Sequence, residues 1–292
     1  MKSRYTIALA VAAAMLAPVS GWAVETAERA PEVPTTFEEE MDLEDQLRGP
    51  DMDPRAAWPG PDGFGYTGAT CTYDWVDIST TGTLLGFTDD NRVGPYALGF
   101  DFNFYGVVFT DVWVGSNGWV HMGPDDPGLY DNSNDCPLPS SNGNEEFIAG
   151  IWDDLDITVC SPEGAGYFEA FAAGSCPWGG YAGACAIAMW QTCHDFSSPP
   201  DDMLFEVILL DDHRAIVQID DPSDEAGDGS TTGIEGLETT LDHGLTYACD
   251  TAGSIAAGDC LEFGPPTGPV FDVVKTATAA AMPGDTVTYT VD

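Results

Sequence analysis

Apolar and polar residues alternate in short runs through the middle of the chain, and this pattern predicts β-strands. In the clearest run, YALGFDFNFYG, three phenylalanines at alternate positions fall on one face of an extended chain, opposite an aspartate and an asparagine. A period of two is that of a strand with one buried face. No window shows a sustained helical period with caps, so the fold is predicted to be all-β. The phenylalanines are Phe100, Phe102 and Phe104.

Further runs rich in β-branched and aromatic residues follow, separated by Gly, Asp, Asn and Pro. About ten strands in roughly 200 residues suit an antiparallel β-sandwich, or a barrel-like variant of it, over residues 67–264. Asn117-Gly118 and the turn Asp211–His213 each predict a tight hairpin. The other predicted strands are Tyr73–Ile78, Val108–Gly115, Trp119–Gly123, Glu146–Trp152, Gly166–Phe171, Ala184–Trp190, Met203–Leu210, Arg214–Asp220 and Gly244–Cys249.

The beginning of the chain has the pattern of a secretory leader. Residues 1–23 combine a basic start with an apolar run too short to span a bilayer, followed by small residues at Gly21 and Ala23. This predicts a signal peptide cleaved after Ala23, the alternative being a membrane anchor. No later segment offers about 18 consecutive apolar residues, so no transmembrane span is expected after signal cleavage. The protein is therefore expected to be secreted or held at a cell surface.

The segments on either side of the predicted sandwich differ from it in composition. Residues 24–66 are rich in Pro, Glu and Asp and predict a disordered acidic tether, with a pro-segment as the alternative. Residues 265–270 have the Pro and Gly content of a linker. Residues 271–292 hold two strand-like pieces around a Pro-Gly-Asp turn, which cannot bury a core by themselves. Either the chain is a fragment of a longer protein, or this strand pair docks elsewhere.

The charge balance excludes one class of partner. With 49 Asp and Glu against 8 Lys and Arg, the formal net charge is −41 at pH 7. Such a chain repels nucleic-acid phosphates and anionic lipid surfaces, so no nucleic acid is expected among its partners. Yet 43% of the residues are hydrophobic, which is too many for a wholly disordered acidic protein. A protein or a carbohydrate at a cell surface is the partner expected, and the oligomeric state stays open.

Eight cysteines lie beyond the predicted leader, and an even number in an exported chain implies four disulfides. On the order of a hundred pairings are possible, so only local pairs can be suggested: Cys249 with Cys260, and Cys185 with Cys193. A zinc site is the alternative, but no Cys-x-x-Cys pair exists, and Cys193-His194 is the only adjacent cysteine and histidine. The cysteines are Cys71, Cys136, Cys160, Cys176, Cys185, Cys193, Cys249 and Cys260.

Three acidic loops suggest calcium, which prefers about six to eight oxygen ligands. In one of them, Asp220, Asp224 and Asp228 recur at four-residue intervals, with glycines that allow sharp turns. The other two loops are residues 89–91 and 125–135. None matches the Asp-x-[Asp/Asn]-x-[Asp/Asn]-Gly pattern, and the alternative is a broadly acidic surface that keeps the protein hydrated in high salt. Calcium is the one cofactor that the sequence suggests, and none is required.

Motifs of known catalytic sites are missing from the sequence, which has no zinc-protease, nucleophile-elbow or phosphate-loop pattern. Asp153, Asp154 and Asp156 would supply the paired carboxylates of a glycosidase. The alternative is that one of them accepts backbone N–H bonds while the others are solvated. We therefore expect a protein that is not an enzyme. Among the tryptophans, Trp178 lies in a Gly-rich loop and is the candidate for an exposed binding platform.

Residues 71–250 resemble the nidogen-like extracellular β domain seen in many large secreted bacterial proteins. The matching pieces, in the family's order, are YDWVDISTTGT, LGFDFNFYGVVFTDVWVGSNGWVHMG, IAGIWDDLDI, AIAMWQTCHDF, LFEVILLDDHRAIVQI and TTGIEGLETTLDHGLTYACD. The most specific run extends from Phe100 to Gly123, with an aromatic strand, Phe-Tyr-Gly, and a strand ending at Asn-Gly. The chain departs from the family in a Gly-rich insertion at residues 161–184 and in four extra cysteines, Cys136, Cys160, Cys176 and Cys185.

Residues 270–292 resemble the opening of an Ig-like repeat of unknown function that is common in bacterial surface and secreted proteins, through DVVKTATAAAMPGDTVTYTV. This match stops after the first two strands of the repeat. Members of both families are typically non-catalytic modules attached to other domains. The resemblances imply a secreted or cell-surface module for adhesion, recognition or structural display. The alternative is an accessory domain of a secreted hydrolase whose catalytic part lies outside this chain.

Overall fold

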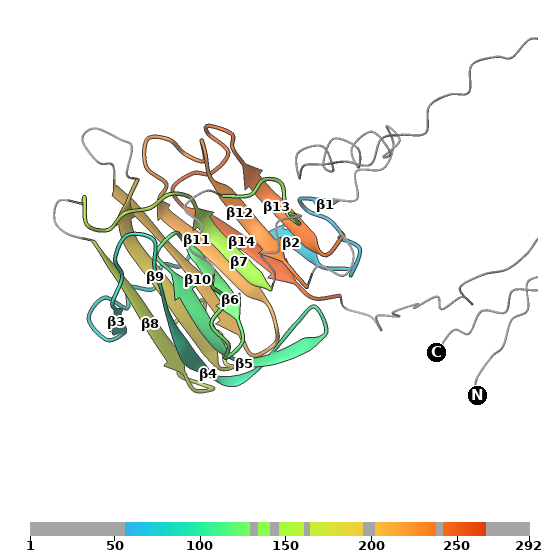
Figure 1. Cartoon of the computed structure of the whole chain (residues 1–292). Helices are drawn as coiled ribbons and strands as arrows, with labels where there is room; N and C mark the ends of the chain where they lie inside the picture. The colour runs from blue at the N-terminus through green and yellow to red at the C-terminus, as the bar shows by residue number, and fades with distance from the viewer. Residues whose placement is uncertain are drawn as a thin grey trace, which may run out of the picture. The chain divides into compact units, whose positions relative to one another are not determined.

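The chain folds into a β-sandwich. In the described residues it forms two seven-stranded sheets packed face to face, with no helix (Figure 1). The predicted all-β fold is therefore confirmed, and these residues contain no helix able to span a bilayer. The predicted signal peptide, most of the tether and the Ig-like segment lie outside them. The computed structural model describes residues 56–128, 134–140, 146–160, 164–194, 202–237 and 242–266.

The first sheet has the strand order β1-β13-β12-β7-β6-β5-β4. Its neighbouring strands are antiparallel except β1 and β13, which pair in parallel. The strands are β1 (Ala56–Ala57), β4 (Arg92–Phe104), β5 (Val107–Gly115), β6 (Trp119–Met122), β7 (Phe147–Trp152), β12 (Thr231–Glu235) and β13 (Gly244–Cys249).

The second sheet has the strand order β2-β14-β11-β10-β9-β8-β3, and every neighbouring pair in it is antiparallel. Its centre is formed by three long strands, and its short strands lie at the edges. The strands are β2 (Thr67–Thr70), β3 (Thr83–Leu85), β8 (Ala165–Phe171), β9 (Cys185–Cys193), β10 (Asp202–Leu210), β11 (Ala215–Asp221) and β14 (Asp259–Gly264).

Aromatic side chains from both sheets fill the interior of the sandwich. Trp190 of β9 stacks on Phe205 of β10 with ring centroids 4.9 Å apart, and both are fully buried. The Trp190 indole N–H donates a hydrogen bond of 2.9 Å to the carbonyl of Gly115, at the end of β5 in the first sheet. Phe102 and Phe104 of β4 belong to the same core, as their alternation predicts. The two sheets are thus joined by apolar packing and by a buried hydrogen bond.

The connection between β2 and β3 covers the outer face of the second sheet. The prediction of a strand at Tyr73–Ile78 is wrong, because this described segment pairs with no strand. Two buried side chains take the place of a partner strand. Gln218 accepts a hydrogen bond from the Asp74 N–H and donates one to the Asp74 carbonyl. Glu206 accepts one from the Val76 N–H.

The connection between β8 and β9 covers more of this outer face. Trp178, which the sequence indicates as an exposed platform, is only 8% exposed. It belongs to a hydrophobic cluster with Val76 and Ile78 of the β2–β3 connection and with Ile187 and Ile208 of the sheet. The Gly-rich loop therefore folds back onto the sheet, and its tryptophan stabilises the fold instead of presenting a free ring.

Both predicted hairpins form. Between β5 and β6, Val114 pairs with Val120 across the Asn-Gly turn. Gly118 in this turn has a φ of +86°, and a Cβ on it would lie 1.8 Å from the carbonyl oxygen of Ile151 on β7. The left-handed backbone and the close approach of β7 both require glycine at this position. The turn at Asp211–His213 joins the antiparallel strands β10 and β11.

The folded unit begins before residue 67. β1 pairs with β13, and Tyr66 is only 1% exposed. Asp62 is also buried, and its Oδ1 accepts hydrogen bonds from the N–H groups of Gly65 and Tyr66. Its Oδ2 accepts a hydrogen bond of 2.6 Å from the Tyr105 hydroxyl. Composition places the end of the tether at residue 66, which is too late. The last residues of that segment already belong to the sandwich, held by buried aromatic and polar side chains.

All eight cysteines form disulfides, and both local pairs suggested by the sequence are wrong. Cys185 and Cys193 are the two ends of the nine-residue strand β9, which holds them roughly 26 Å apart. A disulfide needs a Cα–Cα distance of about 4.4–6.8 Å. Cys249 ends β13 in the first sheet, whereas Cys260 lies in β14 of the second. The observed pairs are Cys71–Cys260, Cys136–Cys249, Cys160–Cys193 and Cys176–Cys185.

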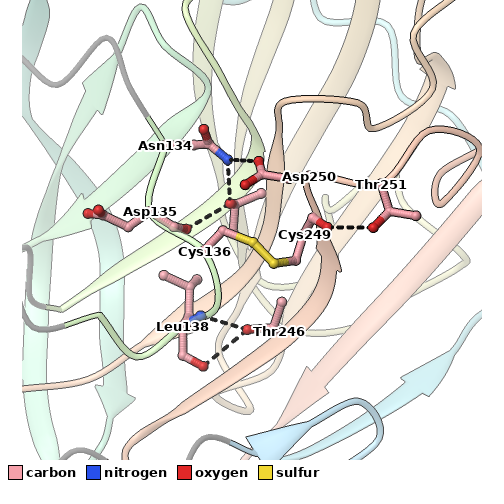
Figure 2. The surroundings of a disulfide bond; sticks show 9 residues. Asn134, Asp135, Cys136, Leu138, Thr246, Cys249, Asp250 and Thr251 are labelled. Carbon is pink, nitrogen blue, oxygen red and sulfur yellow. Dashed lines mark hydrogen bonds between the residues drawn. A yellow bond between two sulfur atoms is a disulfide. The ribbon is translucent and has the colours of Figure 1, made fainter. Parts of the chain in front are cut away.

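Each disulfide joins one cysteine of a connecting segment to one cysteine of a strand. Figure 2 shows this for Cys136 and Cys249, where the segment around Leu138 lies against β13. The Leu138 N–H donates a hydrogen bond of 2.7 Å to the Thr246 hydroxyl, which donates one of 3.0 Å to the Leu138 carbonyl. Leu138 is fully buried in a cluster with Trp152 and other residues of the first sheet. The segment thus covers the outer face of that sheet.

Candidate functional site

Ionisable residues gather at one end of the sandwich. β7 of the first sheet ends at Trp152, and Asp153 and Asp154 follow at once. β9 and β11 of the second sheet are both antiparallel to β10, so they end at the same edge. His194 follows β9, and Glu225 lies in the turn after β11. One ligand atom from each of Asp153, His194 and Glu225 lies within 4.8 Å of the other two.

The Asp153 carboxylate has a fixed orientation. Its Oδ1 accepts a hydrogen bond of 2.8 Å from the Asp154 N–H. Its Oδ2 is buried and accepts no hydrogen bond from the described part of the chain. The residue is 6% exposed, and burial raises its pKa from 3.8 to about 7. An ionised oxygen in this position needs a positive charge or a donor nearby, because the solvent does not reach it.

His194 lies between two carboxylates. Its Nε2 is 3.8 Å from Asp153 Oδ2, and its Nδ1 is 3.1 Å from Glu225 Oε1. The ring is held in place through the backbone, since His194 forms an antiparallel bridge with Leu155. The preceding residue, Cys193, is bonded covalently to Cys160. These contacts keep the imidazole between the two acidic side chains, and the His194 side chain is 10% exposed.

Glu225 belongs to a turn with its own internal hydrogen bonds. The Glu225 N–H donates to the Ser223 hydroxyl at 3.3 Å, and the Glu225 carbonyl accepts from the Asp228 N–H at 3.1 Å. The carbonyl of Ala226 accepts a further hydrogen bond of 3.3 Å from the Ile255 N–H. The Glu225 side chain is 31% exposed, so it forms the solvent side of the cluster.

A second acidic cluster adjoins the first through Asp154. One oxygen from each of Asp89, Asp90 and Asp154 lies within 4.8 Å of the others. Asn117 connects this cluster to the hairpin turn, because its Nδ2 donates to Asp90 Oδ1 at 2.9 Å and its Oδ1 accepts from the Leu155 N–H at 3.2 Å. The sequence indicates the loop at residues 89–91 as a calcium candidate, and the structure brings Asp154 beside it. All three carboxylates reach solvent, and such groups are common without an ion.

The three aspartates considered for a glycosidase have different surroundings. β7 ends at Trp152, so Asp154 and Asp156 lie beyond the strand and do not share one of its faces. Asp156 is buried, and its Oδ1 accepts a hydrogen bond of 2.7 Å from the Thr158 N–H. The Asp156 N–H donates to the Cys193 carbonyl at 3.0 Å. These bonds give Asp156 a structural role beside the cluster.

Asp220, Asp224 and Asp228, the calcium candidates from the sequence, are in none of the ligand groups found among the described residues. Their side chains are exposed, and Asp220 accepts a hydrogen bond from the Tyr73 hydroxyl. A calcium site at these aspartates stays a prediction. In the same loop, Glu225 joins a cluster, although no motif or spacing in the sequence distinguishes it.

The adjacent pair Cys193-His194 contributes one residue to the cluster and not two. Cys193 is bonded to Cys160, so its sulfur is not free to ligate a metal as a thiolate. His194 instead lies near Asp153 and Glu225. The adjacency of cysteine and histidine was therefore a useful signal for the histidine alone.

An antiparallel β-sandwich with four disulfides has the features of an extracellular β domain. The family model described as NIDO related matches residues 65–254, well over half of the chain. The chain therefore belongs to the NIDO-related family, which confirms the nidogen-like resemblance over these residues. No curated protein and no solved structure matches it. The family and the disulfides fit a non-catalytic extracellular module.

Proposed function

We propose that this protein is a secreted or cell-surface module that acts by binding, in adhesion, recognition or structural display, and that it is not an enzyme. Membership of the NIDO-related family supports the class of protein. The observation that carries the proposal is the placement of the disulfides, each of which fastens a connecting segment to a strand. Connecting segments on a rigid scaffold are where binding surfaces are usually built.

A connecting segment that a disulfide holds against a strand lowers the entropic cost of binding a partner. A loop that is already ordered loses less conformational entropy when a partner docks on it, so more of the contact energy appears as affinity. The covalent bonds act at both ends of β9, through Cys185 at its start and Cys193 at its end. The surface at each end of the second sheet is therefore preorganised for a partner.

The charge of the chain limits which partner is expected. A net charge of −41 favours a neutral or basic protein surface, or a neutral carbohydrate, and repels nucleic acid and anionic lipid. Binding that depends mainly on this charge would weaken steeply with salt, whereas recognition by shape through fastened loops would persist. Salt dependence therefore separates specific recognition from general attraction.

The test uses the full chain in its oxidised form, applied to immobilised extracellular proteins and glycans. We expect saturable binding that persists in high salt. At least one double variant, such as Cys176→Ser with Cys185→Ser, should lose binding while keeping the circular dichroism of a β protein. The Cys71→Ser with Cys260→Ser variant is the matched control, because it also removes one disulfide but releases a different connecting segment.

Two outcomes would contradict the proposal. One is the absence of binding to any protein or glycan by the folded chain. The other is turnover of a glycan or peptide substrate that Asp153→Asn abolishes. Secretion is tested separately, because N-terminal sequencing of protein from the culture medium should give a chain that begins after Ala23. Intact protein retained in the cell would refute that part.

A further inference from the structure

We propose that Asp153, His194 and Glu225 form a binding site for one divalent transition-metal ion, with zinc as the test ion. The site lies at the end of the sandwich where β7, β9 and β11 terminate. It does not depend on the proposed recognition role, because it concerns the donors of this chain and no partner.

The donor set indicates the class of metal. An imidazole nitrogen together with two carboxylates suits zinc and its first-row neighbours, whereas calcium takes oxygen ligands. In a tetrahedral site, ligand atoms about 2.0–2.2 Å from the ion lie roughly 3.3–3.6 Å apart. Asp153 Oδ2 lies 3.8 Å from one nitrogen of His194, and Glu225 Oε1 lies 3.1 Å from the other. A single ion can bind only one imidazole nitrogen, and one nitrogen of His194 lies within 4.8 Å of an oxygen of each carboxylate. With Nε2 as the ligand, the partly exposed Glu225 side chain has to turn from the Nδ1 side toward Asp153 to complete the set.

The buried oxygen of Asp153 is the independent sign of a cation. Oδ2 accepts no hydrogen bond from the described residues, although the carboxylate is more than nine-tenths buried. The distance of 3.8 Å to His194 Nε2 is too long for a hydrogen bond. The hydrogen bond from the Asp154 N–H to Oδ1 keeps Oδ2 aimed at the imidazole. A Cβ on Gly229 would still be 3.9 Å from Oδ2, so the turn leaves this side of the oxygen without a side chain.

An ion pair is the competing interpretation. A protonated His194 between Asp153 and Glu225 would satisfy the charges without a metal. On that interpretation, neutralising either carboxylate changes stability, and the protein takes up no ion. The metal interpretation requires stoichiometric uptake, so the two differ in a directly measurable quantity.

The test is equilibrium dialysis of the full oxidised chain against zinc in the presence of excess calcium. Calcium occupies weak sites among the many surface carboxylates and competes poorly for an imidazole. We expect one zinc ion per chain. Asp153→Asn, His194→Gln and Glu225→Gln should each weaken binding by more than about 100-fold, beyond the range typical of groups that only orient a ligand. Asp224→Asn, in the same turn and exposed, is the matched control and should retain zinc.

X-ray absorption on the zinc-loaded wild-type protein gives a readout that does not depend on the folding of any variant. We expect one imidazole together with oxygen ligands at about 2.0–2.2 Å. The proposal is overturned if zinc does not bind in excess calcium, if the three variants retain it, or if the spectrum contains no imidazole. Stoichiometric calcium binding that Asp153→Asn abolishes would overturn the assignment of the metal class.

Discussion

Glu206 should make the stability of this protein fall as the pH rises. It lies in β10 with no exposed surface, beneath the connection that covers the second sheet. Its Oε1 accepts hydrogen bonds from the Val76 N–H at 3.2 Å and from Gln218 Nε2 at 2.6 Å. Burial raises its pKa from 4.5 to about 8, and the charges of Asp74 and Asp220 add to the rise. The folded protein therefore keeps this carboxyl protonated at pH values where the unfolded chain ionises it.

The sign of the effect follows from proton binding. Because the folded state binds this proton more tightly than the unfolded state, the Glu206 contribution to the free energy of unfolding decreases with pH. The decrease begins near the unfolded pKa of 4.5 and is complete above the folded pKa of about 8. Between pH 5 and pH 9 these two pKa values correspond to a loss of about 4 kcal/mol. Solvent screening does not reduce this figure, since the side chain is fully buried.

The Glu206→Gln variant removes this titration and keeps the shape of the side chain. Near pH 5 it should be no more stable than the wild type, because the amide NH2 would replace Oε2, which has no hydrogen-bond partner among the described residues. Near pH 9 it should have gained about 4 kcal/mol relative to the wild type. The measurement is urea unfolding of both proteins over this pH range, with the difference taken at each pH. The surface carboxylates are common to both proteins and cancel in that difference.

A difference between the two proteins that stays constant with pH would refute the reasoning, because Glu206 would then titrate alike in the folded and unfolded states. Glu169→Gln is the matched control. Glu169 is a half-exposed glutamate of β8 whose carboxylate accepts a hydrogen bond of 2.6 Å from the Thr81 hydroxyl. Its variant should give a pH profile parallel to the wild type. If Glu169→Gln gained as much stability near pH 9, the effect would come from repulsion among the acidic groups in general and not from Glu206.

Replacing Cys136 and Cys249 with serine removes a link between residues 113 positions apart and should lower the free energy of unfolding by about 4 kcal/mol in urea; unchanged stability would contradict a fastened segment. Leu138→Ala leaves a cavity beneath that segment and should cost about 3 kcal/mol, measured by thermal melting. Gly118→Ala should cost more than about 3 kcal/mol, because the new Cβ meets a carbonyl of β7. Gly99→Ala, also at positive φ but with open space around it, should cost only about 1 kcal/mol, and equal losses would contradict the close-approach argument.

Alternation in the sequence identifies segments with one buried face. This explains why β4 is predicted correctly and why the strand predicted at Tyr73–Ile78 is wrong. β4 was predicted because its phenylalanines alternate with polar residues on a half-buried strand. β12 (Thr231–Glu235) was not, because its five residues, Thr-Thr-Gly-Ile-Glu, include a single apolar side chain even though all of them are buried. Tyr73–Ile78 alternates as β4 does, since Val76 and Ile78 pack onto the second sheet. Its backbone, however, is bonded by side chains of the sheet and not by a strand, and alternation carries no information about the backbone partner.

The candidate metal site was harder to predict, because what brings its residues together is long-range pairing. The sequence indicates Asp153 as a catalytic candidate and His194 as the neighbour of a cysteine, but the two residues lie far apart in the chain and no local pattern connects them. Their proximity depends on β9 and β11 flanking β10, with β7 ending opposite them in the other sheet. Glu225 had no distinguishing signal at all. The choice of Cys160 as the partner of Cys193 also decides the chemistry here, because it removes a thiolate from the site and fixes the backbone of His194. A covalent bond that sequence could not assign therefore determines which donors remain available to a metal.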